Sequence, residues 1–541
     1  MVRSSFLSSF ALLSHHLVTA SENPPPGTPL LAYGLYNTPE TLQPTQLEII
    51  GHIPSWITGS LYRGAQAGWD AGNYSADHWF DGFSRNHRFE IENGSVIYRS
   101  RNASDEVQDF VRETGFYPDG GFANDPCKVI YGDFETTFRN SSGNVGSVGT
   151  DSIKVSYIRN FPGLDPNSTN FGPLVTLVAT TDGTNILQQI DPVTLEPIEL
   201  FSYGTTSPTL DSGLSGAHPA IGKNGEVYNY LLDLAAEPPV YKVFGIENGV
   251  GRVLANITDA PPAYIHSLFS TEHYVILVVW QCDLGAPVVE NSTNFIDTFQ
   301  PWDTERDALF YVVSKTEGGV VAKYTAPTFY AFHEINSFED HGDIVVDLPW
   351  MSDYTWIEGT RMPYFRDNVG RPNQTNPIMD IPATFTRFRL PDFRHGNSEN
   401  GTLETRKASI DFSLPLKENN IELPKINEAY LHKSYRYAYG IHVEKPGFFA
   451  DSIIKIDVDT RTSKLWVPET NHLPSEPIFV ARPGSEKEDD GVLLIVAMDE
   501  ERELSSLVVI DAGTMKEIGR AKMPVVMGYG FHGLFAEQSE Y

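Results

Sequence analysis

Four histidines, each inside a separate strand-like apolar segment, are the feature that most constrains how this chain can fold. They are His218, His266, His333 and His532, and successive members lie 48, 67 and 199 residues apart. None of these intervals is the i, i+4 spacing with which one helix presents two metal ligands. If the four act together, the fold must bring distant strands to one point, as a metal held by neutral imidazoles would require. The competing interpretation is four unrelated histidines buried at strand ends.

Short apolar segments separated by Gly, Pro, Asn and Asp recur along the chain and predict an all-β fold. Examples are VTLVAT, HYVILVVW and GVLLIVAM, whereas long helical periodicity is scarce. The pairs Asp81–Gly82 and Asn93–Gly94 are predicted to form hairpin turns. A chain of 541 residues is compatible with a single all-β body, because propellers exceed the usual domain size.

The segments around the histidines contain a series of distinctive motifs in a fixed order. They are GSLYRG, HWFDGFSRNHRFEIENGSVIYRSR, GAHPAIGKNGE, IHSLFSTEHYV, FHEINSFED, YRYAYG, SEPIFVARPGSEKEDDGVLL and GFHGLF. Together, from about Gly59 to Gly533, they resemble the carotenoid cleavage oxygenase family. Members of this family are non-haem iron enzymes that split a polyene or stilbene double bond with O2.

The resemblance implies a seven-bladed β-propeller, with short helices and loops capping one face over a central iron. Seven blades would give about 75 residues each, which is ample for four strands and their loops. We find no blade-to-blade repeat in the sequence itself. The expected organisation is a signal peptide at 1–20, a Pro-rich segment at 21–50 and one catalytic propeller domain at 51–541.

The resemblance also implies that the four histidines hold Fe2+. Four neutral imidazoles leave one or two open positions on a dipositive ion, which suits O2 binding beside an uncharged apolar substrate. Zinc is the competing metal, but catalytic zinc usually takes three protein ligands and has no redox chemistry. No catalytic residue beyond the iron centre is predicted.

Three carboxylates are expected outside the histidines, because a metal-bound imidazole generally donates its second N–H to such a group. Matching the family motifs places Glu422 in IELPKIN and Glu476 in SEPIFV. The third falls in VATTDGTNILQQIDPVTLEP, where the family commonly has Glu. Here the nearest carboxylate is Asp182, one position out of register, so the sequence leaves this contact open.

The substrate is predicted from two positions that correspond to the phenol-binding Tyr and Lys of stilbene cleavers. They are Phe116 and Thr181, and neither can bind a phenolate as that pair would. We therefore expect cleavage of a carotenoid or apocarotenoid to carbonyl products. Aromatic residues near the ligand segments, such as Tyr264, could line a tunnel or belong to the core.

Three further functions stay open. One is stilbene-type phenylpropanoid cleavage, and another is retinoid isomerase-type chemistry at the same iron. The third, a non-catalytic binding propeller, would be expected to have lost its ligands, and all four ligand motifs are intact. The remaining histidines, among them His78 and His341, are interpreted as core, turn or surface residues.

The N-terminus and the sequons predict passage through the secretory pathway to the cell exterior. The first 20 residues contain an early Arg, an apolar stretch and a small-residue ending, as a signal peptide does. Roughly four sequons are expected by chance, but the chain has nine, at Asn73, Asn93, Asn102, Asn140, Asn167, Asn256, Asn291, Asn373 and Asn400. The competing prediction is an intracellular enzyme, peripheral on membranes.

The net charge of the chain excludes more classes of binding partner than its cysteine content does. The net charge of −31 argues against nucleic acid and against electrostatic docking on anionic lipid. Contact with a membrane would therefore need an apolar patch. Cys127 and Cys282 allow at most one disulfide.

Overall fold

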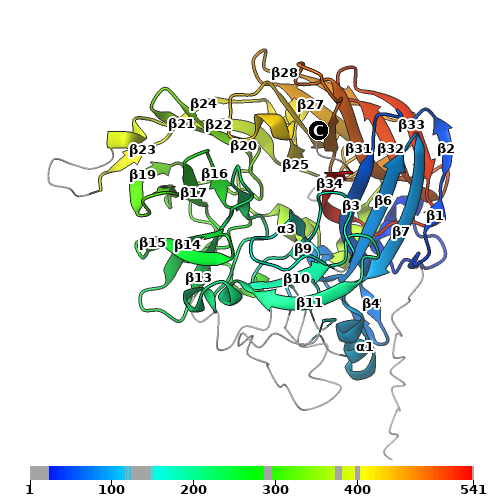
Figure 1. Ribbon diagram of the computed structural model, residues 1–541, viewed down its shortest axis with the longest axis horizontal. Coiled ribbons are helices and arrows are strands. Elements are labelled where there is room, and N and C mark those ends of the chain that lie inside the picture. Colours follow the sequence, from blue (N-terminus) through cyan, green and yellow to red (C-terminus); the bar gives the residue numbers. More distant parts are fainter. Residues whose placement is uncertain are drawn as a thin grey trace, which may run out of the picture.

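The fold is a ring of seven β-sheets around a central axis (Figure 1). The computed structural model describes residues 24–115, 117, 121–123, 148–149, 151–167, 169–285, 295–371, 380–395 and 403–538. Within them, each large sheet has four to six strands and forms one blade of a propeller. The predicted seven-bladed fold is therefore confirmed.

The first three blades contain the following strands. Blade 1 has β1 (Thr45–Gln46), β7 (Ser95–Asn102), β6 (Phe83–Glu92), β3 (Gly59–Gly68) and β34 (Gly530–Glu537). Blade 2 has β8 (Ser156–Arg159), β9 (Leu177–Thr180), β10 (Ile186–Ile190) and β11 (Pro197–Ser202). Blade 3 has β12 (Ala220–Ile221), β13 (Val227–Asp233), β14 (Val240–Glu247) and β15 (Val250–Ile257).

The other four blades follow in chain order. Blade 4 has β16 (Phe269–Ser270), β17 (Tyr274–Val279), β18 (Ala308–Ser314), β19 (Val320–Ala326) and β23 (Thr405–Lys407); blade 5 has β20 (Asn336–Asp340), β21 (Asp343–Trp350), β22 (Thr384–Leu390) and β24 (Ser409–Ser413). Blade 6 has β25 (Glu422–Lys425), β26 (Tyr437–His442), β27 (Ser452–Asp457) and β28 (Thr462–Trp466). Blade 7 has β2 (Glu48–Gly51), β33 (Lys516–Lys522), β32 (Leu504–Asp511), β31 (Gly491–Asp499), β29 (His472–Pro474) and β30 (Ile478–Ala481).

The ring is closed by strands from opposite ends of the chain. β34, near the C-terminus, pairs antiparallel with β3 in blade 1, with Arg63 opposite Gly533. β1 and β2, which lie within or overlap segment 21–50, add outer strands to blades 1 and 7. Blade 1 therefore contains strands from both ends of the chain, and this pairing closes the ring.

The strands are rich in β-branched and aliphatic residues because both faces of a blade are covered by its neighbours. All nine residues of β31 are buried. Leu61 and Phe89 of blade 1 pack in one cluster with Ile478 and Leu494 of blade 7. Part of the hydrophobic core therefore lies between the last and the first blade.

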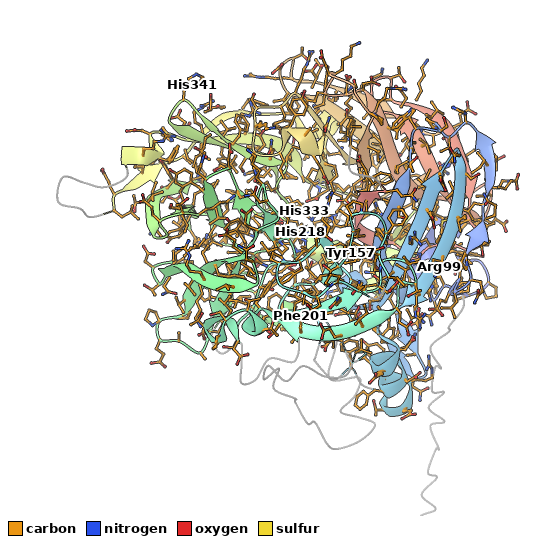
Figure 2. All side chains as sticks on the ribbon, in the orientation of Figure 1. Arg99, Tyr157, Phe201, His218, His333 and His341 are labelled. Carbon is orange, nitrogen blue, oxygen red and sulfur yellow. The ribbon has the colours of Figure 1, made fainter. Side chains whose placement is uncertain are left out.

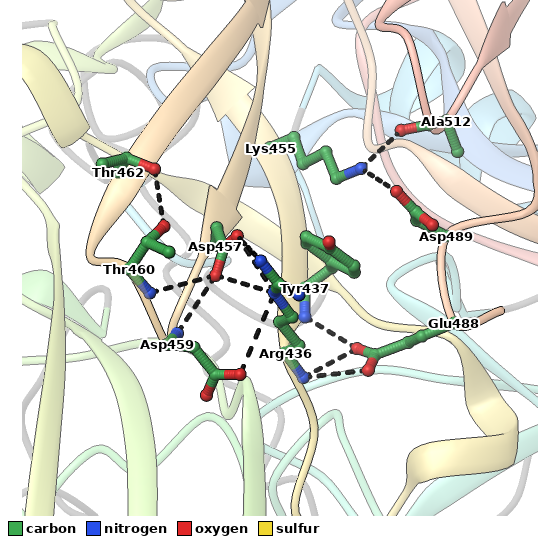
Figure 3. A network of polar contacts seen from close by, with 10 residues as sticks. All are labelled: Arg436, Tyr437, Lys455, Asp457, Asp459, Thr460, Thr462, Glu488, Asp489 and Ala512. Carbon is green, nitrogen blue, oxygen red and sulfur yellow. Dashed lines mark hydrogen bonds and ion pairs between the residues drawn. The ribbon is translucent and has the colours of Figure 1, made fainter.

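Polar contacts also join neighbouring blades, as Figure 3 shows for blades 6 and 7. Lys455 of β27 donates to the Asp489 carboxylate (2.7 Å) and to the Ala512 carbonyl (3.0 Å). The Glu488 carboxylate accepts the backbone N–H groups of Arg436 and Tyr437 at 2.8 and 2.7 Å. These bonds hold the loop before β31 against blade 6.

One of the two predicted turns is present. Asn93 and Gly94 have φ of 50° and 77° and join β6 to β7, as a two-residue hairpin turn requires. The prediction for Asp81–Gly82 is wrong, because Asp81 ends a short 3₁₀ helix (Trp79–Asp81). Its carboxylate accepts the N–H groups of Phe122 and Ala123 at 2.5 and 2.9 Å, so it anchors a loop instead.

Helices are few and short. The α-helices are α1 (Asp105–Thr114), α3 (Trp356–Gly359), α4 (Met362–Asn368) and α5 (Leu416–Asn419). The 3₁₀ helices are Leu30–Leu35, Trp79–Asp81, Tyr203–Thr205, Pro208–Leu210, Ile296–Thr298, Phe393–His395 and Glu428–Tyr430. Helices α3 and α4 lie in the connection from β21 to β22, and this connection contacts the Trp79–Asp81 helix through the bond from Trp79 N–H to Thr360 O (3.1 Å). In the described part of the chain, none of the helices has the length and apolar character needed to cross a membrane.

Candidate metal centre

The propeller brings the four predicted histidines together near its axis. The ring nitrogens that they offer all lie within 4.8 Å of one another, and the Nε2 atoms of His333 and His532 are 3.1 Å apart. Figure 2 shows His218 and His333 near the middle of the ring, whereas His341 lies at its outer edge. We call His218, His266, His333 and His532 the histidine cluster.

Local structure explains why the four side chains converge. His218, His266 and His333 each stand two or three residues before the first strand of their blades, β12, β16 and β20. His532 lies in β34, the C-terminal strand of blade 1. The inner ends of four blades thus each supply one imidazole, which is how separations of 48 to 199 residues are bridged.

The environment favours the neutral form of two members of the cluster, His218 and His532. Burial lowers the pKa of His218 and of His532 well below the ordinary value, and the neighbouring imidazoles lower each further. The Nε2 atom of His218 is buried and has no hydrogen-bond partner, although an unmet buried acceptor costs about 1–3 kcal/mol. A metal ion bound by the lone pair would remove that cost, so this donor set fits the implied iron.

Three carboxylates bind the opposite sides of three of these imidazoles. The Nδ1 atom of His266 lies 2.6 Å from Asp182 Oδ2. The Nδ1 atom of His333 lies 2.5 Å from Glu422 Oε2, and that of His532 lies 2.7 Å from Glu476 Oε1. Because an ionised carboxylate only accepts, each Nδ1 carries the proton and each Nε2 lone pair is free for a metal.

Every blade contributes one residue to this arrangement. The histidines come from blades 1, 3, 4 and 5. Asp182 lies between β9 and β10 of blade 2, Glu422 begins β25 of blade 6, and Glu476 lies between β29 and β30 of blade 7. In the described residues no carboxylate bonds to His218, so this ligand is oriented differently.

Asp182 contacts the side chain of one cluster histidine and the backbone next to another. Besides His266, its Oδ1 atom accepts the backbone N–H of Ala217 (2.9 Å), the residue before His218. Its Oδ2 atom also accepts the Tyr264 hydroxyl at 2.8 Å. The structure therefore places Asp182 where the sequence comparison left the third carboxylate open.

Tyr264 is a contact that the sequence did not identify, since the motif only suggested an aromatic near a ligand. Its ring packs against Phe122 and Phe299 at centroid distances of 5.8 and 6.0 Å, while its hydroxyl reaches Asp182. Burial and the charge of Asp182 raise the pKa of Tyr264 well above 10. The hydroxyl thus stays protonated and donates to the carboxylate.

Aromatic side chains surround the cluster on the side of α3. Phe332 contacts His266 (5.4 Å between ring centroids) and Trp356 (5.6 Å), and Phe80 contacts Phe531 (5.5 Å), which precedes His532. These residues make the surroundings of the cluster apolar on this side.

An apolar cavity lies on the side of blades 6 and 7, close to Glu422 and Glu476. Its wall includes Leu423 and Ser475, which are next to Glu422 and Glu476 in the chain, together with Trp79, Ile441, Phe449, Leu473, Pro474, Val496, Met498, Ser505, Met527, Gly528, Tyr529 and Gly530. No sequence motif marks these residues as a group, because several separate segments supply them.

The two predicted substrate positions have different outcomes. Thr181 is half-buried and directly precedes Asp182. Phe116 lies outside the described residues. Of the remaining histidines, His78 is buried with its ring 2.9 Å from Ile357 O, and His341 is exposed beside Asp340.

Comparisons with known proteins find relatives over nearly the whole chain. A family model described as retinal pigment epithelial membrane protein matches residues 36–537. The chain is 30% identical over 542 residues to a carotenoid dioxygenase of Neurospora crassa, covering 91% of this chain and 88% of the relative. It is 31% identical over 539 residues to a torulene dioxygenase of Gibberella fujikuroi, covering 91% of each. A solved variant of Synechocystis apocarotenoid oxygenase has a TM-score of 0.72 at 21% identity, covering 94% of this chain and 98% of that one, a likeness in fold.

Proposed function

The chain belongs to the family of the retinal pigment epithelial membrane protein and the carotenoid oxygenases, and on this premise we propose that it cleaves a carotenoid or apocarotenoid double bond with O2 and Fe(II). The chain is a dioxygenase. The observation that carries the proposal is the histidine cluster with a carboxylate behind three of its members.

The histidine cluster would hold the iron, and the carboxylates would fix the imidazoles that bind it. When bound, Fe(II) supplies the O2 chemistry by which an alkene and O2 yield two carbonyl groups, one oxygen atom going to each. Asp182, Glu422 and Glu476 hold the Nδ1 protons, so that the Nε2 lone pairs face one point. Four neutral imidazoles carry no negative charge, so the bound ion would keep its positive charge beside an apolar substrate.

The aromatic residues around the cluster suit an extended hydrocarbon. Phe332, Trp356 and Phe80 offer flat apolar faces to a conjugated chain and exclude water from the reacting bond. The named activities of the relatives, carotenoid and torulene cleavage, support the same substrate class.

Stilbene cleavage is the first competing function, and a substrate panel separates it from the proposal. We expect aldehyde or ketone products from carotenoids or apocarotenals and little turnover of hydroxystilbenes, because Thr181 supplies no cation for a phenolate. A buried phenol without partners would lose about 1–3 kcal/mol per unmet group, or roughly 5- to 150-fold in kcat/KM. Mass spectrometry of products from the iron-loaded protein is the measurement. Efficient cleavage of hydroxystilbenes beside inert carotenoids would reverse this assignment.

The same incubation under 18O2 separates cleavage from isomerisation and from binding without turnover. Label in both carbonyl products supports dioxygenase chemistry. An isomerised retinoid without label would instead indicate isomerase-type chemistry, and bound iron with no turnover of any substrate would indicate a binding propeller. His341→Ala removes an exposed imidazole outside the histidine cluster. It should give the same labelled products as the unaltered protein.

We also propose that the protein passes through the secretory pathway, which the sequons and the leader-like segment support. Asn73, Asn93 and Asn256 are exposed and accessible to a glycan. Asn167 is engaged by both ends of its amide, with Gln189 and Ile190, and is a poorer acceptor. After expression in a eukaryotic secretory host, endoglycosidase treatment should lower the mass, and Asn73→Gln should remove one glycan. An unchanged mass would favour an intracellular location.

A further inference from the structure

Glu476 differs from the other two carboxylates of the site in having cations beside it. Its Oε1 atom lies 3.1 Å from Lys425 Nζ, and its Oε2 atom lies 3.9 Å from Arg63 Nη1. In the described part of the chain, Asp182 and Glu422 have no Lys or Arg within 4 Å. A buried carboxylate is costly unless it is paired and hydrogen-bonded, and Glu476 is completely buried.

Both oxygens of Glu476 are in use. Oε1 accepts His532 Nδ1 at 2.7 Å and also faces the Lys425 ammonium. Oε2 accepts the backbone N–H of Gly533 at 2.8 Å. Lys425 thus pairs with the same oxygen as the ligand imidazole, and it fixes where that oxygen lies.

Arg63 provides the rigid frame for this pair. It is fully buried in β3, and its two terminal nitrogens donate to the carbonyls of Glu476 (2.9 Å) and Phe531 (3.3 Å). These carbonyls belong to the carboxylate residue itself and to the residue before His532. The backbone of the His532–Glu476 pair is therefore held by Arg63, while the carboxylate end is held by Lys425 from blade 6.

Lys425 can make this contact because of its place on the innermost strand of blade 6. It lies at the end of β25, three residues after Glu422, and its side chain is 35% exposed. The strand that supplies one carboxylate of the site thus also supplies the cation for a carboxylate of the next blade. An ammonium on that oxygen also reduces the negative charge that the imidazole feels.

We propose that Lys425 is a positioning residue of the metal centre, which orients Glu476 and, through it, the His532 imidazole. The inference rests on the proposed metal-binding function. It assigns to Lys425 a role in metal affinity and in the ligand field, with no direct contact to metal or substrate.

The test measures Co2+ binding to the full-length, metal-depleted chain by its visible absorption, so that no substrate is needed. Lys425→Met should weaken Co2+ binding roughly 5- to 10-fold, less than the 10- to 100-fold typical of a group that touches the imidazole. It should also shift the Co2+ absorption bands. Lys425→Arg should restore most of the affinity. Lys433→Met, which removes an exposed ammonium that donates to Ala429 O, should change neither quantity.

A double-mutant cycle with Glu476→Gln decides whether Lys425 acts through Glu476. In the Glu476→Gln background, Lys425→Met should cost little further Co2+ affinity. The inference would be overturned if Lys425→Met lowered the Co2+ affinity equally in the wild-type and Glu476→Gln backgrounds, or if it left the affinity of the wild-type background unchanged. Neither result would contradict the metal centre itself. An unaltered chain that binds neither Co2+ nor Fe2+ would overturn the proposed function and this inference with it.

Discussion

His333→Ala should abolish both iron binding and cleavage. The purified wild-type chain should contain one Fe(II), bound by the histidine cluster. Removing one imidazole leaves a three-nitrogen site, and it also leaves Glu422, which is buried and bonded to His333 at 2.5 Å, with the Leu423 N–H as its remaining hydrogen-bond donor. A buried carboxylate that loses one of its donors is destabilising, so we expect local rearrangement to add to the loss of metal. Metal analysis and turnover of the same preparation are the two measurements.

His341→Ala is the matched control. It removes an imidazole whose side chain is 97% exposed at the rim of blade 5, so iron content and activity should be unchanged. Stoichiometric zinc in the wild-type chain, or full iron content in His333→Ala, would contradict the assignment of the metal centre.

The ligands could be predicted because each histidine lies in a short motif that is local in sequence. The motifs around His218, His266, His333 and His532 lie at or near the start of a strand. Turn residues and apolar runs indicate where a strand starts. That the four histidines converge could not be predicted in the same way. The blades carry no sequence repeat, and the separation of the histidines along the chain says little about the distance between them in space. Only the resemblance supplied that link.

The limits of the sequence are clearest at Asp182 and Lys425. Asp182 is followed by Gly183 with φ of 70°, and the loop places Asp182 Oδ2 2.6 Å from His266 Nδ1. Sequence matching compares positions, whereas the contact to His266 depends on where the loop carries the oxygen. Lys425 pairs with a carboxylate 51 residues away, on another blade, and nothing in IELPKIN indicates it.

Asp182→Asn and Glu476→Gln should be more damaging than Glu422→Gln. In Asp182 and Glu476 both oxygens accept N–H donors, and an amide has only one oxygen, so each variant leaves a donor unmet. In Glu422 one oxygen accepts from both His333 and Leu423, and Oε1 has no partner. An amide can reproduce that pattern and loses only the charge.

Replacing a residue that holds a ligand imidazole typically costs 10- to 100-fold in metal affinity or activity. We therefore expect Glu422→Gln near the lower end, about 10-fold, and the other two near about 100-fold. Tyr264→Phe removes one donor to Asp182 and leaves the charge, so it should cost less than Asp182→Asn. Glu428→Gln, at a surface ion pair with Arg159, is the control carboxylate. Co2+ affinity and kcat/KM, measured on all five variants, test the order.

The decisive comparison is Asp182 with Glu422, because the sequence and the structure rank them differently. The sequence matched Glu422 clearly and left Asp182 open, which would make Asp182 the less important of the two. The contacts rank them the other way, since Asp182 bridges His266 and the backbone beside His218 whereas Glu422 serves one histidine. An Asp182→Asn variant that binds Co2+ as tightly as wild type would show that the loop contact is dispensable, and that two carboxylates are enough to orient the centre.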